Sequence, residues 1–458
     1  MGKHAAAIAE MKALLGDRLS TSPSVLGLHA RDEAHYPETP PDAVAFPETA
    51  QEVSEVVKIC ARHGCPVVPW GVGTSLEGHA LPFRGGVTVD TSLMKKVEQI
   101  YAEDLCCKVQ PGITREELNT ELRATGLFFP IDPGANATIG GMTATNASGT
   151  MAVRYGTMKD NVMGMEVVLA DGRIIRTGTR AKKSSSGYDL TRLMVGSEGT
   201  LGIITEITLK LHGTPEAISA AVCTFPDVTS AVNSVILAVQ MGLPAARMEL
   251  VDAESIKAIN AYSDMSLAEE PHLFMEFHGS ETGVAEDAGR MAEIVEDMGG
   301  SGFEWTTKAE DRTKLWHARH NAYFAMKSMK PGSVGISTDV CVPISNLAQA
   351  IDDTIADVEA HGWIAPIVGH VGDGNYHTLF LFDPDSDADR ALAKELTHRM
   401  NERALALDGT VTGEHGIGVG KMKYMAAEHG EAVSVMAAVK KALDPEGIMN
   451  PGKVVEVN

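Results

Sequence analysis

Apolar positions recur with two different periods along the first part of the chain. Residues 49–63 place valine and cysteine at helical spacing behind Thr49-x-x-Glu52, the pattern of a capping box, and predict a helix. Thr114-x-x-Glu117 predicts a second capped helix that ends near residue 125. Short apolar runs predict buried strands at 65–68, 86–91 and 106–110. Strand and helix thus alternate, which favours an α/β fold over a β-sandwich.

Farther along, strand patterns dominate. Residues 165–178 read as two strands joined by a two-residue turn, Asp171-Gly172, and residues 203–211 as a further strand. Gly213-Thr214-Pro215 marks a boundary. Beyond it, strands alternate with helices near 217–225, 245–251, 271–278 and 301–306. We expect a second α/β unit with an antiparallel sheet.

The composition narrows the choice of partners and compartment. A length of 458 residues predicts two or three domains, and 39 basic against 61 acidic residues give a net charge of −22. This charge disfavours nucleic acid and anionic membranes as partners. Six cysteines show no metal-binding spacing, so Cys106-Cys107 reads as buried strand. With no apolar signal segment and no membrane span, a bacterial cytoplasmic enzyme, at most peripheral to the membrane, is the expectation.

The stretch from Pro69 to His79 is a candidate phosphate-binding loop. It follows a predicted strand and holds three glycines and two small hydroxyl residues. Such a loop can point successive N–H groups at an anion, above all at the pyrophosphate of a dinucleotide. It is not the Rossmann fingerprint, because Leu76 stands where the third glycine belongs and no helical pattern follows. A plain glycine-rich turn is the alternative.

A second unusual stretch, residues 133–149, consists almost wholly of Gly, Ala, Ser, Thr and Asn. Small residues at this density let the backbone approach a ligand closely, which suits the wall of a cofactor site. A low-complexity linker is the alternative, but Ile139 and Met142 interrupt the run and patterned strands flank it.

The sequence around His370 and His377 predicts a metal site. If residues 372–375 form a four-residue turn, the two histidines lie directly opposite each other on one face of a hairpin, about 5 Å apart at Cβ. Two imidazoles so placed can share a divalent cation, with Glu414 as third ligand and a coordination position left open. On spacing alone, His415 next to it could instead be a catalytic base. The alternative is that these are ordinary hydrogen-bonded core histidines.

These motifs occur in one order together with Gly196-Ser197-Glu198-Gly199-Thr200-Leu201-Gly202, Gly413-Glu414-His415-Gly416 and the run from Asp444 to Lys453. From about residue 43 to 454 the chain resembles the flavin-linked D-2-hydroxy acid dehydrogenases of the vanillyl-alcohol-oxidase-type (PCMH-type) flavoprotein superfamily. FAD-dependent D-lactate dehydrogenases of the mitochondrial type are the nearest resemblance. It implies an N-terminal helical segment at 1–37, a PCMH-type FAD-binding domain at 38–214, an α+β substrate domain with an antiparallel sheet at 215–410 and a C-terminal segment, 411–458, that returns to the flavin.

The resemblance also implies roles for particular residues. FAD is held without a covalent bond to His79, and its pyrophosphate binds the loop from Gly71 to Gly78. The implied FAD-binding residues are Pro69, Gly71, Gly73, Thr74, Ser75, Gly78, His79, Pro133, Gly134, Thr138, Gly140, Gly141, Thr145, Asn146, Ser148, Gly149, Gly199, Ile203 and Asn450. His370, His377 and Glu414 would bind zinc, manganese or another divalent ion. His415 would take the proton of the substrate hydroxyl.

Arg319 matches the position that holds the substrate carboxylate in this family, although without the resemblance an arginine on a solvated helix face is the simpler interpretation. In the 2-hydroxyglutarate branch a lysine stands two residues before the aspartate that corresponds to Asp339, where this chain has Ser337. A second carboxylate would lack its cation, so short monocarboxylic acids, D-lactate first, are expected.

The expected reaction is oxidation of a D-2-hydroxy acid to the 2-keto acid, with electrons passed to an external acceptor such as a cytochrome, a quinone or an electron-transferring flavoprotein. Two relatives within the resemblance stay open as alternatives, a flavin subunit like the glycolate oxidase D subunit and a D-2-hydroxyglutarate dehydrogenase. A metal hydrolase with structural glycine-rich loops is a rival from another class. The oligomeric state is open, with a homodimer as one option.

Overall fold

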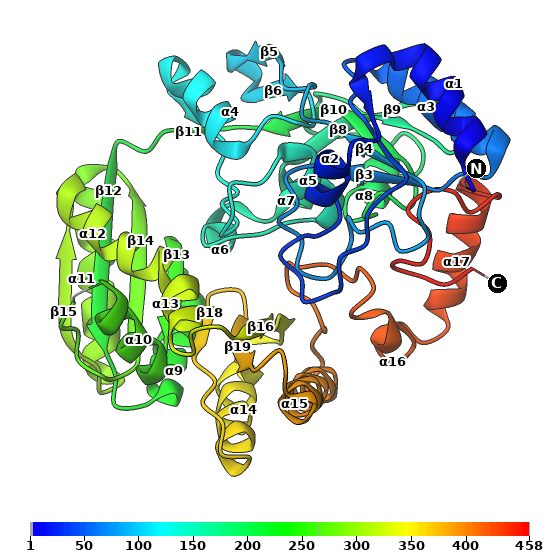
Figure 1. Ribbon diagram of the computed structural model, residues 1–458. Coiled ribbons are helices and arrows are strands. Elements are labelled where there is room, and N and C mark those ends of the chain that lie inside the picture. The colour runs from blue at the N-terminus through cyan, green and yellow to red at the C-terminus, as the bar shows by residue number, and fades with distance from the viewer. Residues whose placement is uncertain (1–2, 264, 458) are drawn as a thin grey trace. The chain divides into compact units, whose positions relative to one another are not determined.

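The computed structural model describes residues 3–263 and 265–457. The chain forms two compact units, and the chain crosses between them several times (Figure 1). Unit 1 comprises Met1–Ser148, Gly156–Thr214 and Glu414–Asn458, and unit 2 comprises Gly149–Tyr155 and Pro215–Gly413. The predicted division into four segments stays a prediction.

Unit 1 contains two sheets. The first has the strand order β1-β2-β4-β3, in which β2, β4 and β3 run parallel, and the second has the antiparallel order β5-β6-β10-β8-β9. The first sheet and its helices are α1 (Ala5–Leu15), β1 (Leu19–Ser20), α2 (Pro23–Leu28), β2 (Ala43–Ala45), α3 (Ala50–His63), β3 (Val67–Trp70) and β4 (Val87–Asp90). The second sheet is made of β5 (Val97–Tyr101), β6 (Cys106–Val109), β8 (Val162–Val168), β9 (Ile174–Gly178) and β10 (Ile203–Lys210).

The remaining elements of unit 1 are shorter and lie between or after these strands. They are α4 (Arg115–Leu122), β7 (Leu127–Phe128), α5 (Ile139–Thr145), α7 (Met158–Asn161), α8 (Leu190–Met194), β11 (His212–Gly213), α16 (Met425–His429) and α17 (Ala432–Leu443). Single 3-10 turns occur at Gly16–Arg18, Ala102–Asp104, Arg123–Thr125 and Met422–Tyr424. The C-terminal segment returns to β3, where Val67 donates to the Ile448 carbonyl and Asn450 donates to the Val67 carbonyl.

The two predicted capping boxes are not formed to the same extent in the structure. In α4 both halves of the box are present, since Thr114 and Glu117 each accept a hydrogen bond from the other's backbone N–H. In α3 only Thr49 plays its part, by accepting from the N–H of Glu52. The Glu52 carboxylate instead accepts from the Glu48 N–H and from Arg18, so the box predicted there is only half formed.

Two other local predictions differ from the structure. The hairpin of β8 and β9 has a three-residue loop, because Leu169 pairs with Arg173, so the predicted two-residue turn is wrong. Residues 139–145, predicted as part of an irregular backbone wall, form helix α5, whose N-cap Thr138 accepts from the Gly141 N–H. Small residues gave this segment no apolar periodicity from which a helix could be predicted.

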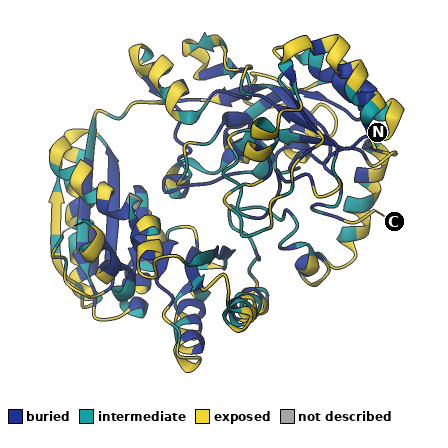
Figure 2. Ribbon diagram, viewed as in Figure 1, coloured by how far each residue is buried: buried dark blue, intermediate teal, exposed yellow. Residues whose placement is uncertain are grey.

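Unit 2 is built on one eight-stranded sheet of order β15-β12-β14-β13-β18-β19-β16, with β17 paired to β19. All its strand pairs are antiparallel, which confirms the predicted antiparallel sheet. The strands are β12 (Ala217–Thr224), β13 (Ala245–Val251), β14 (His272–Gly279), β15 (Ser301–Thr306), β16 (Val334–Ser337), β17 (Val340–Cys341), β18 (Ile367–His370) and β19 (Asn375–Phe382). The central strands are buried (Figure 2).

Helices cover both faces of this sheet. They are α6 (Ala152–Tyr155), α9 (Val228–Gln240), α10 (Ala253–Ser263), α11 (Glu281–Asp297), α12 (Ala309–His320), α13 (Ala322–Ser328), α14 (Leu347–Ala360) and α15 (Asp387–Ala406), with a 3-10 turn at Ile344–Asn346. One face packs its apolar side chains against α9, α11 and α14. The other packs Val251, Phe274 and Val368 against α10, α12 and α13. Among the described residues, we find no helix with the length and apolarity that a membrane span needs.

Candidate active site

In unit 2 the candidate residues lie on the sheet face that α10, α12 and α13 cover. Side chains alternate between faces along a strand, so Glu249 of β13 and His370 of β18, which are register partners, point to the same face as Val251 and Val368. Asn375 and His377 of β19 share this face, since Asn375 pairs with His370. The face therefore changes from an apolar cluster under the helices to a polar group on β13, β18 and β19.

The register of the β18–β19 hairpin differs from the predicted one. His370 pairs with Asn375, and His377 pairs with Val368, so the two histidines are diagonal neighbours rather than direct partners. The error is a slip of two residues, which keeps every side chain on its face because strands have a period of two. The two imidazoles are nevertheless close to each other, as predicted. Their ring centroids are 5.4 Å apart, and one ligand atom of each histidine lies within 4.8 Å of the other.

Hydrogen bonds define which nitrogen of each imidazole carries the lone pair. Nδ1 of His370 lies 2.7 Å from Oε1 of Glu249, and Nδ1 of His377 lies 2.9 Å from the Thr338 carbonyl oxygen. Both partners are acceptors, so each Nδ1 carries the proton and each Nε2 carries a lone pair. Paired Nε2 lone pairs on buried imidazoles whose Nδ1–H groups are held by oxygen are the donor set of a metal-binding histidine pair. The two histidines thus fit a divalent cation.

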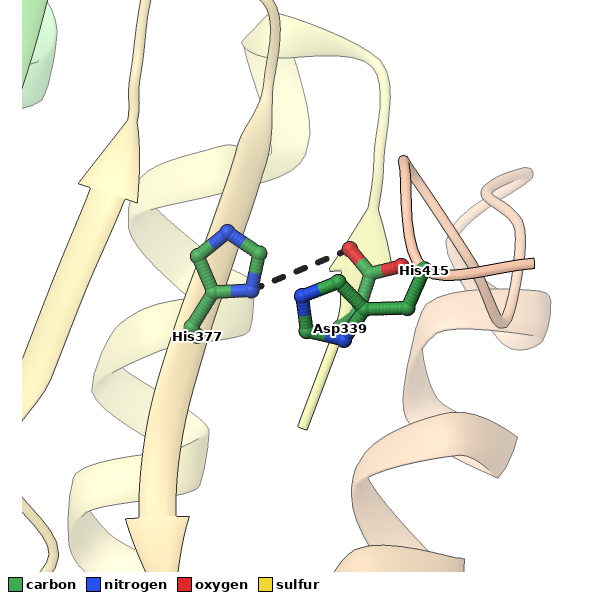
Figure 3. A group of neighbouring side chains, drawn as sticks. All are labelled: Asp339, His377 and His415. Carbon is green, nitrogen blue, oxygen red and sulfur yellow. Dashed lines mark ion pairs between the residues drawn. The ribbon is translucent and has the colours of Figure 1, made fainter. Parts of the chain in front are cut away.

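Asp339 is a further acidic group beside His377, and sequence reasoning gave it no role. Its carboxylate is buried and lies 3.8 Å from Nδ1 of His377 (Figure 3). It also accepts hydrogen bonds from the side chains of Asn375 and Thr412. Gly413 follows at once, and a Cβ there would lie 2.4 Å from the Asn375 amide nitrogen. Thr412 is therefore hydrogen-bonded to Asp339, and Gly413 packs closely against Asn375 of the histidine hairpin.

Glu414, the predicted third ligand, is the next residue in the chain and the first of the last segment of unit 1. Its Cα is tied to that of Gly413 by one trans peptide, a separation of about 3.8 Å. Covalent continuity alone therefore keeps Glu414 close to the end of the hairpin. His415, the predicted base, is one residue farther on.

Arg319 is nine-tenths buried, in the last turn of α12, which excludes the solvated-face interpretation. Its Nη2 lies 2.7 Å from Oε2 of Glu249, and its Nε has no hydrogen-bond partner among the described residues. A buried guanidinium with a donor left over is suited to an anionic ligand. Sequence reasoning missed Glu249, although a lone carboxylate inside the apolar run 245–251 was a signal of a buried charge that needs partners.

Burial would raise the pKa of Glu249, but its electrostatic interactions with His370 and with the Arg319 guanidinium, together with the hydrogen bond from His370, outweigh burial, so the pKa lies below its ordinary value. The carboxylate is therefore ionised at neutral pH, where it accepts a hydrogen bond from His370 and forms an ion pair with Arg319.

In unit 1 the predicted phosphate loop packs against the start of α5. A Cβ on Gly71 would lie 2.4 Å from Oγ1 of Thr138, the residue that caps this helix. Gly73 has φ +72°, which only glycine adopts without strain. Pro69 lies under Gly199 of the 196–202 loop. The structure thus brings together three of the predicted FAD-binding stretches, and this close backbone packing fits a cradle for a dinucleotide.

Some of the other predicted FAD-binding residues make hydrogen bonds within the protein. Asn450 donates from its amide to the carbonyls of His79 and Glu198, which ties the C-terminal segment to both loops. Asn146 follows α5 at φ +52° and its side chain accepts from the Lys159 N–H. Gly149 falls in unit 2, apart from the other predicted FAD-binding residues. The remaining ones lie in unit 1, in the loops 71–79 and 133–134, in or just after α5, and at the first residue of β10: Thr74, Ser75, Gly78, Pro133, Gly134, Gly140, Gly141, Thr145, Ser148 and Ile203.

The segment that carries His415 is anchored to the same loops of unit 1. Glu198 accepts hydrogen bonds from the N–H groups of Ile417 and Gly418, at 2.7 and 2.8 Å, and Val419 donates to the Glu77 carbonyl. Burial raises the pKa of Glu198 to about 7, although these hydrogen bonds and the Lys453 charge lower it. Burial also lowers the pKa of His79 to about 3, with the Lys453 and Lys421 charges in the same direction, so this imidazole is neutral.

The comparisons with known proteins identify the family. Residues 41–178 match the FAD binding domain model, and residues 214–454 match the model of FAD linked oxidases, C-terminal domain. The chain is 48% identical over 455 residues to the probable mitochondrial D-lactate dehydrogenase of Danio rerio, covering 98% of this chain and 92% of the relative. It is 45% identical to the mitochondrial D-lactate dehydrogenase [cytochrome] of Arabidopsis thaliana, covering 98% and 80%.

The solved structure of 4-ethylphenol oxidase from Gulosibacter chungangensis matches with a TM-score of 0.80 at 18% identity, covering 98% of this chain and 97% of that one. At this identity the match speaks for the fold alone, and together with the two family models it confirms the predicted fold class, an FAD-binding domain followed by an α+β domain.

The predicted source and compartment are wrong. We expected a bacterial cytoplasmic protein, whereas the similar D-lactate dehydrogenases of Danio rerio and Arabidopsis thaliana are mitochondrial and eukaryotic. Cysteine usage and net charge report on redox conditions and solubility, and neither property separates one reducing compartment from another.

The resemblance drawn from the motifs is confirmed by these matches, which together cover nearly the whole chain. The chain belongs to the family of FAD-linked oxidases and carries both the FAD-binding domain and the C-terminal domain of that family.

Proposed function

We propose that this chain oxidises a short D-2-hydroxy acid, D-lactate first, to the 2-keto acid, and that the electrons leave to a cytochrome. The observation that carries the proposal is the juxtaposition in unit 2 of two imidazoles with Nε2 lone pairs and a buried arginine with a donor left over. Relatives in two organisms are D-lactate dehydrogenases, and the name of one of them includes a cytochrome, which supports the substrate and the acceptor.

The residues divide the work as follows. Arg319 binds the substrate carboxylate through donors that Glu249 does not use, which fixes the orientation of C2. His415 accepts the hydroxyl proton. His370, His377 and Glu414 would hold a zinc or manganese ion, and the loop from Gly71 to Gly78 would hold the FAD pyrophosphate without a covalent bond.

When bound, FAD supplies the hydride acceptor and a divalent ion supplies Lewis acidity toward the hydroxyl oxygen. The alternative from the sequence analysis is a metal hydrolase. Hydrolysis needs no flavin, so this alternative does not account for the FAD-binding domain.

The size of the substrate follows from Ser337. It ends β16, two residues before Asp339, and offers no positive charge to a distal carboxylate. Burying an unpaired carboxylate costs several kcal/mol, roughly. D-lactate and D-2-hydroxybutyrate are therefore favoured over D-2-hydroxyglutarate.

The test is anaerobic mixing of the FAD-loaded protein with D-lactate, L-lactate, D-2-hydroxybutyrate and D-2-hydroxyglutarate, with flavin absorbance as the readout. We expect rapid bleaching with the two short D-acids, and little with the others. Chelation should abolish the bleaching, and added Zn²⁺ or Mn²⁺ should restore it. Bleaching that is equally fast with D-2-hydroxyglutarate would contradict the assigned substrate size.

Two variants assign the effect of chelation to residues. His377→Ala and Glu414→Ala should stay yellow but fail to bleach, because FAD is held by unit 1 loops that neither residue belongs to. A colourless protein from either variant would mean that the residue supports the fold and not the chemistry.

A further inference from the structure

The Glu249 side chain occupies a position that no motif pointed to. It is fully buried in β13, where its Oε1 lies 2.7 Å from Nδ1 of His370 and its Oε2 lies 2.7 Å from Nη2 of Arg319. A buried carboxylate is costly unless its oxygens are paired, and here each oxygen serves a different partner. One partner is a predicted metal ligand and the other the predicted carboxylate-binding residue.

Each of the two contacts has a definite chemical effect. The hydrogen bond from His370 fixes the proton on Nδ1, orients the ring and makes Nε2 a better electron-pair donor. The ion pair with Arg319 uses one terminal nitrogen and leaves Nε without a partner among the described residues. Glu249 thus determines which atoms of both side chains are presented to ligands.

We propose that Glu249 is a positioning residue that couples the binding of the divalent ion to the binding of the substrate carboxylate. This inference rests on the proposed function. A single rigid carboxylate sets the ring of His370 and the guanidinium of Arg319 at once, so the loss of its charge weakens binding at both places.

The alternative is that Glu249 only neutralises buried charge, and the same sheet face offers a matched control for it. Glu276 of β14 is also buried, lies 2.7 Å from Nε2 of His278 and 3.5 Å from a terminal nitrogen of Arg247, and pairs in register with Arg247. It repeats the Glu–His–Arg grouping one strand pair away. Neither His278 nor Arg247 belongs to the predicted ligands.

The experiment compares Glu249→Gln and Glu276→Gln with the parent protein and with His370→Ala, all FAD-loaded and treated with chelator. Mn²⁺ is added alone, and its dissociation constant is measured from the electron paramagnetic resonance of free Mn²⁺. The half-saturating D-lactate concentration for dye reduction is measured in parallel, and flavin content and urea unfolding report on the fold.

We expect Glu249→Gln to keep its flavin, to bind Mn²⁺ roughly 10–100-fold more weakly, and to need more D-lactate for half-saturation. Glu276→Gln should bind Mn²⁺ as the parent does. Unchanged Mn²⁺ affinity in Glu249→Gln, or an equal loss in Glu276→Gln, overturns the inference. If Glu249→Gln does not fold, Glu249→Asp, which is too short to reach both partners, is judged by the same outcomes.

Failure of the proposed function has a different signature in this experiment. It would appear as equal Mn²⁺ binding by His370→Ala and the parent protein, which removes the metal site itself. Normal loss in His370→Ala with full retention in Glu249→Gln would remove only the positioning role of Glu249.

Discussion

Arg319 illustrates how burial converts a common residue into a ligand-binding one. A guanidinium on a solvated helix face forms weak pairs, worth about 0–1 kcal/mol, and gains little from an added anion. In the last turn of α12, Arg319 is nine-tenths buried and Glu249 pairs with its Nη2, while its Nε is buried and has no hydrogen-bond partner among the described residues. Under the proposed function, a substrate carboxylate would accept the hydrogen bond that this Nε does not make within the described residues.

Arg319→Gln should therefore cost about 2 kcal/mol of substrate-binding free energy, which lowers kcat/KM for D-lactate roughly 30-fold. Most of this loss should appear as a higher KM. Mn²⁺ affinity should change much less, because Glu249 keeps its bond to His370. Steady-state dye reduction and Mn²⁺ titration of the same preparation check both statements. A lowered kcat with unchanged KM would assign Arg319 to the chemical step instead of substrate binding.

At this scale, contacts between residues that are close in the sequence could be predicted, and contacts between distant residues could not. The two histidines could be paired from their spacing, because a hairpin brings near neighbours together. Glu249 and Asp339 are 121 and 38 positions away from the histidines with which they interact, and no local pattern connects residues at that distance. Only the order of strands in the sheet makes β13 the neighbour of β18.

At the scale of single elements, the β18–β19 hairpin and α5 show two kinds of error. The register of the hairpin was wrong by two residues because its loop, 371–374, begins one residue earlier than predicted. Period two made the error harmless for the face on which the histidines lie. Helix α5 was missed altogether because glycine, alanine and threonine give no amphipathic signal, and its cap, Thr138, looked like one more small residue.

Substitutions at two adjacent glycines of α5 can distinguish a glycine that is needed for packing from one that is needed for contact with a ligand. A Cβ on Gly140 would lie 2.5 Å from Cβ of Pro111 and 2.9 Å from its carbonyl oxygen, so this glycine is required by the protein itself. A Cβ on Gly141 would meet only Oγ1 of Thr138, at 3.1 Å. Among the predicted FAD-binding residues, Gly141 is therefore the better probe of close approach by the flavin.

Gly140→Ala should lower the free energy of unfolding by roughly 1–3 kcal/mol through overpacking. Gly141→Ala should leave it nearly unchanged, because the helix propensity that alanine gains over glycine, up to about 1 kcal/mol, offsets the tight contact of the new Cβ with Oγ1 of Thr138. If Gly141 faces the cofactor, Gly141→Ala purifies with reduced FAD content although it is stably folded. Urea unfolding and the absorbance ratio of flavin to protein measure the two effects, and full flavin content in Gly141→Ala would remove this residue from the predicted FAD-binding set.

At the scale of the whole molecule, the division into units was only partly visible in the sequence. The sequence change at Gly213-Thr214-Pro215 coincides with one crossing, since unit 2 resumes at Pro215. The segment 149–155 was unexpected: it belongs to unit 2, where Tyr155 hydrogen-bonds His278 and Arg154 donates to the Pro244 carbonyl. A seven-residue excursion carries too few apolar positions for any periodicity to assign it.

The net charge of −22 acts on both of the proposed reaction partners. It repels an anionic substrate over long range, so under the proposed function binding of D-lactate would depend on the local positive charge of Arg319. It attracts a positively charged protein, and such steering raises association rates by roughly 10–10³ at low salt. A basic cytochrome is therefore a better acceptor for this chain than an acidic one.

Reduction of a basic cytochrome by the D-lactate-reduced enzyme should accordingly slow by roughly tenfold between ~10 mM and ~150 mM ionic strength, because the Debye length falls from about 30 to 8 Å over this range. Reduction of a small uncharged dye should stay nearly constant, since its encounter with the protein involves no charge. Stopped-flow traces of flavin reoxidation with each acceptor at several salt concentrations give the comparison. A rate of cytochrome reduction that is independent of salt would mean that electrons leave at a surface patch where positive side chains cancel the negative charge of the chain. Quinones and other neutral carriers would then be the next acceptors to test.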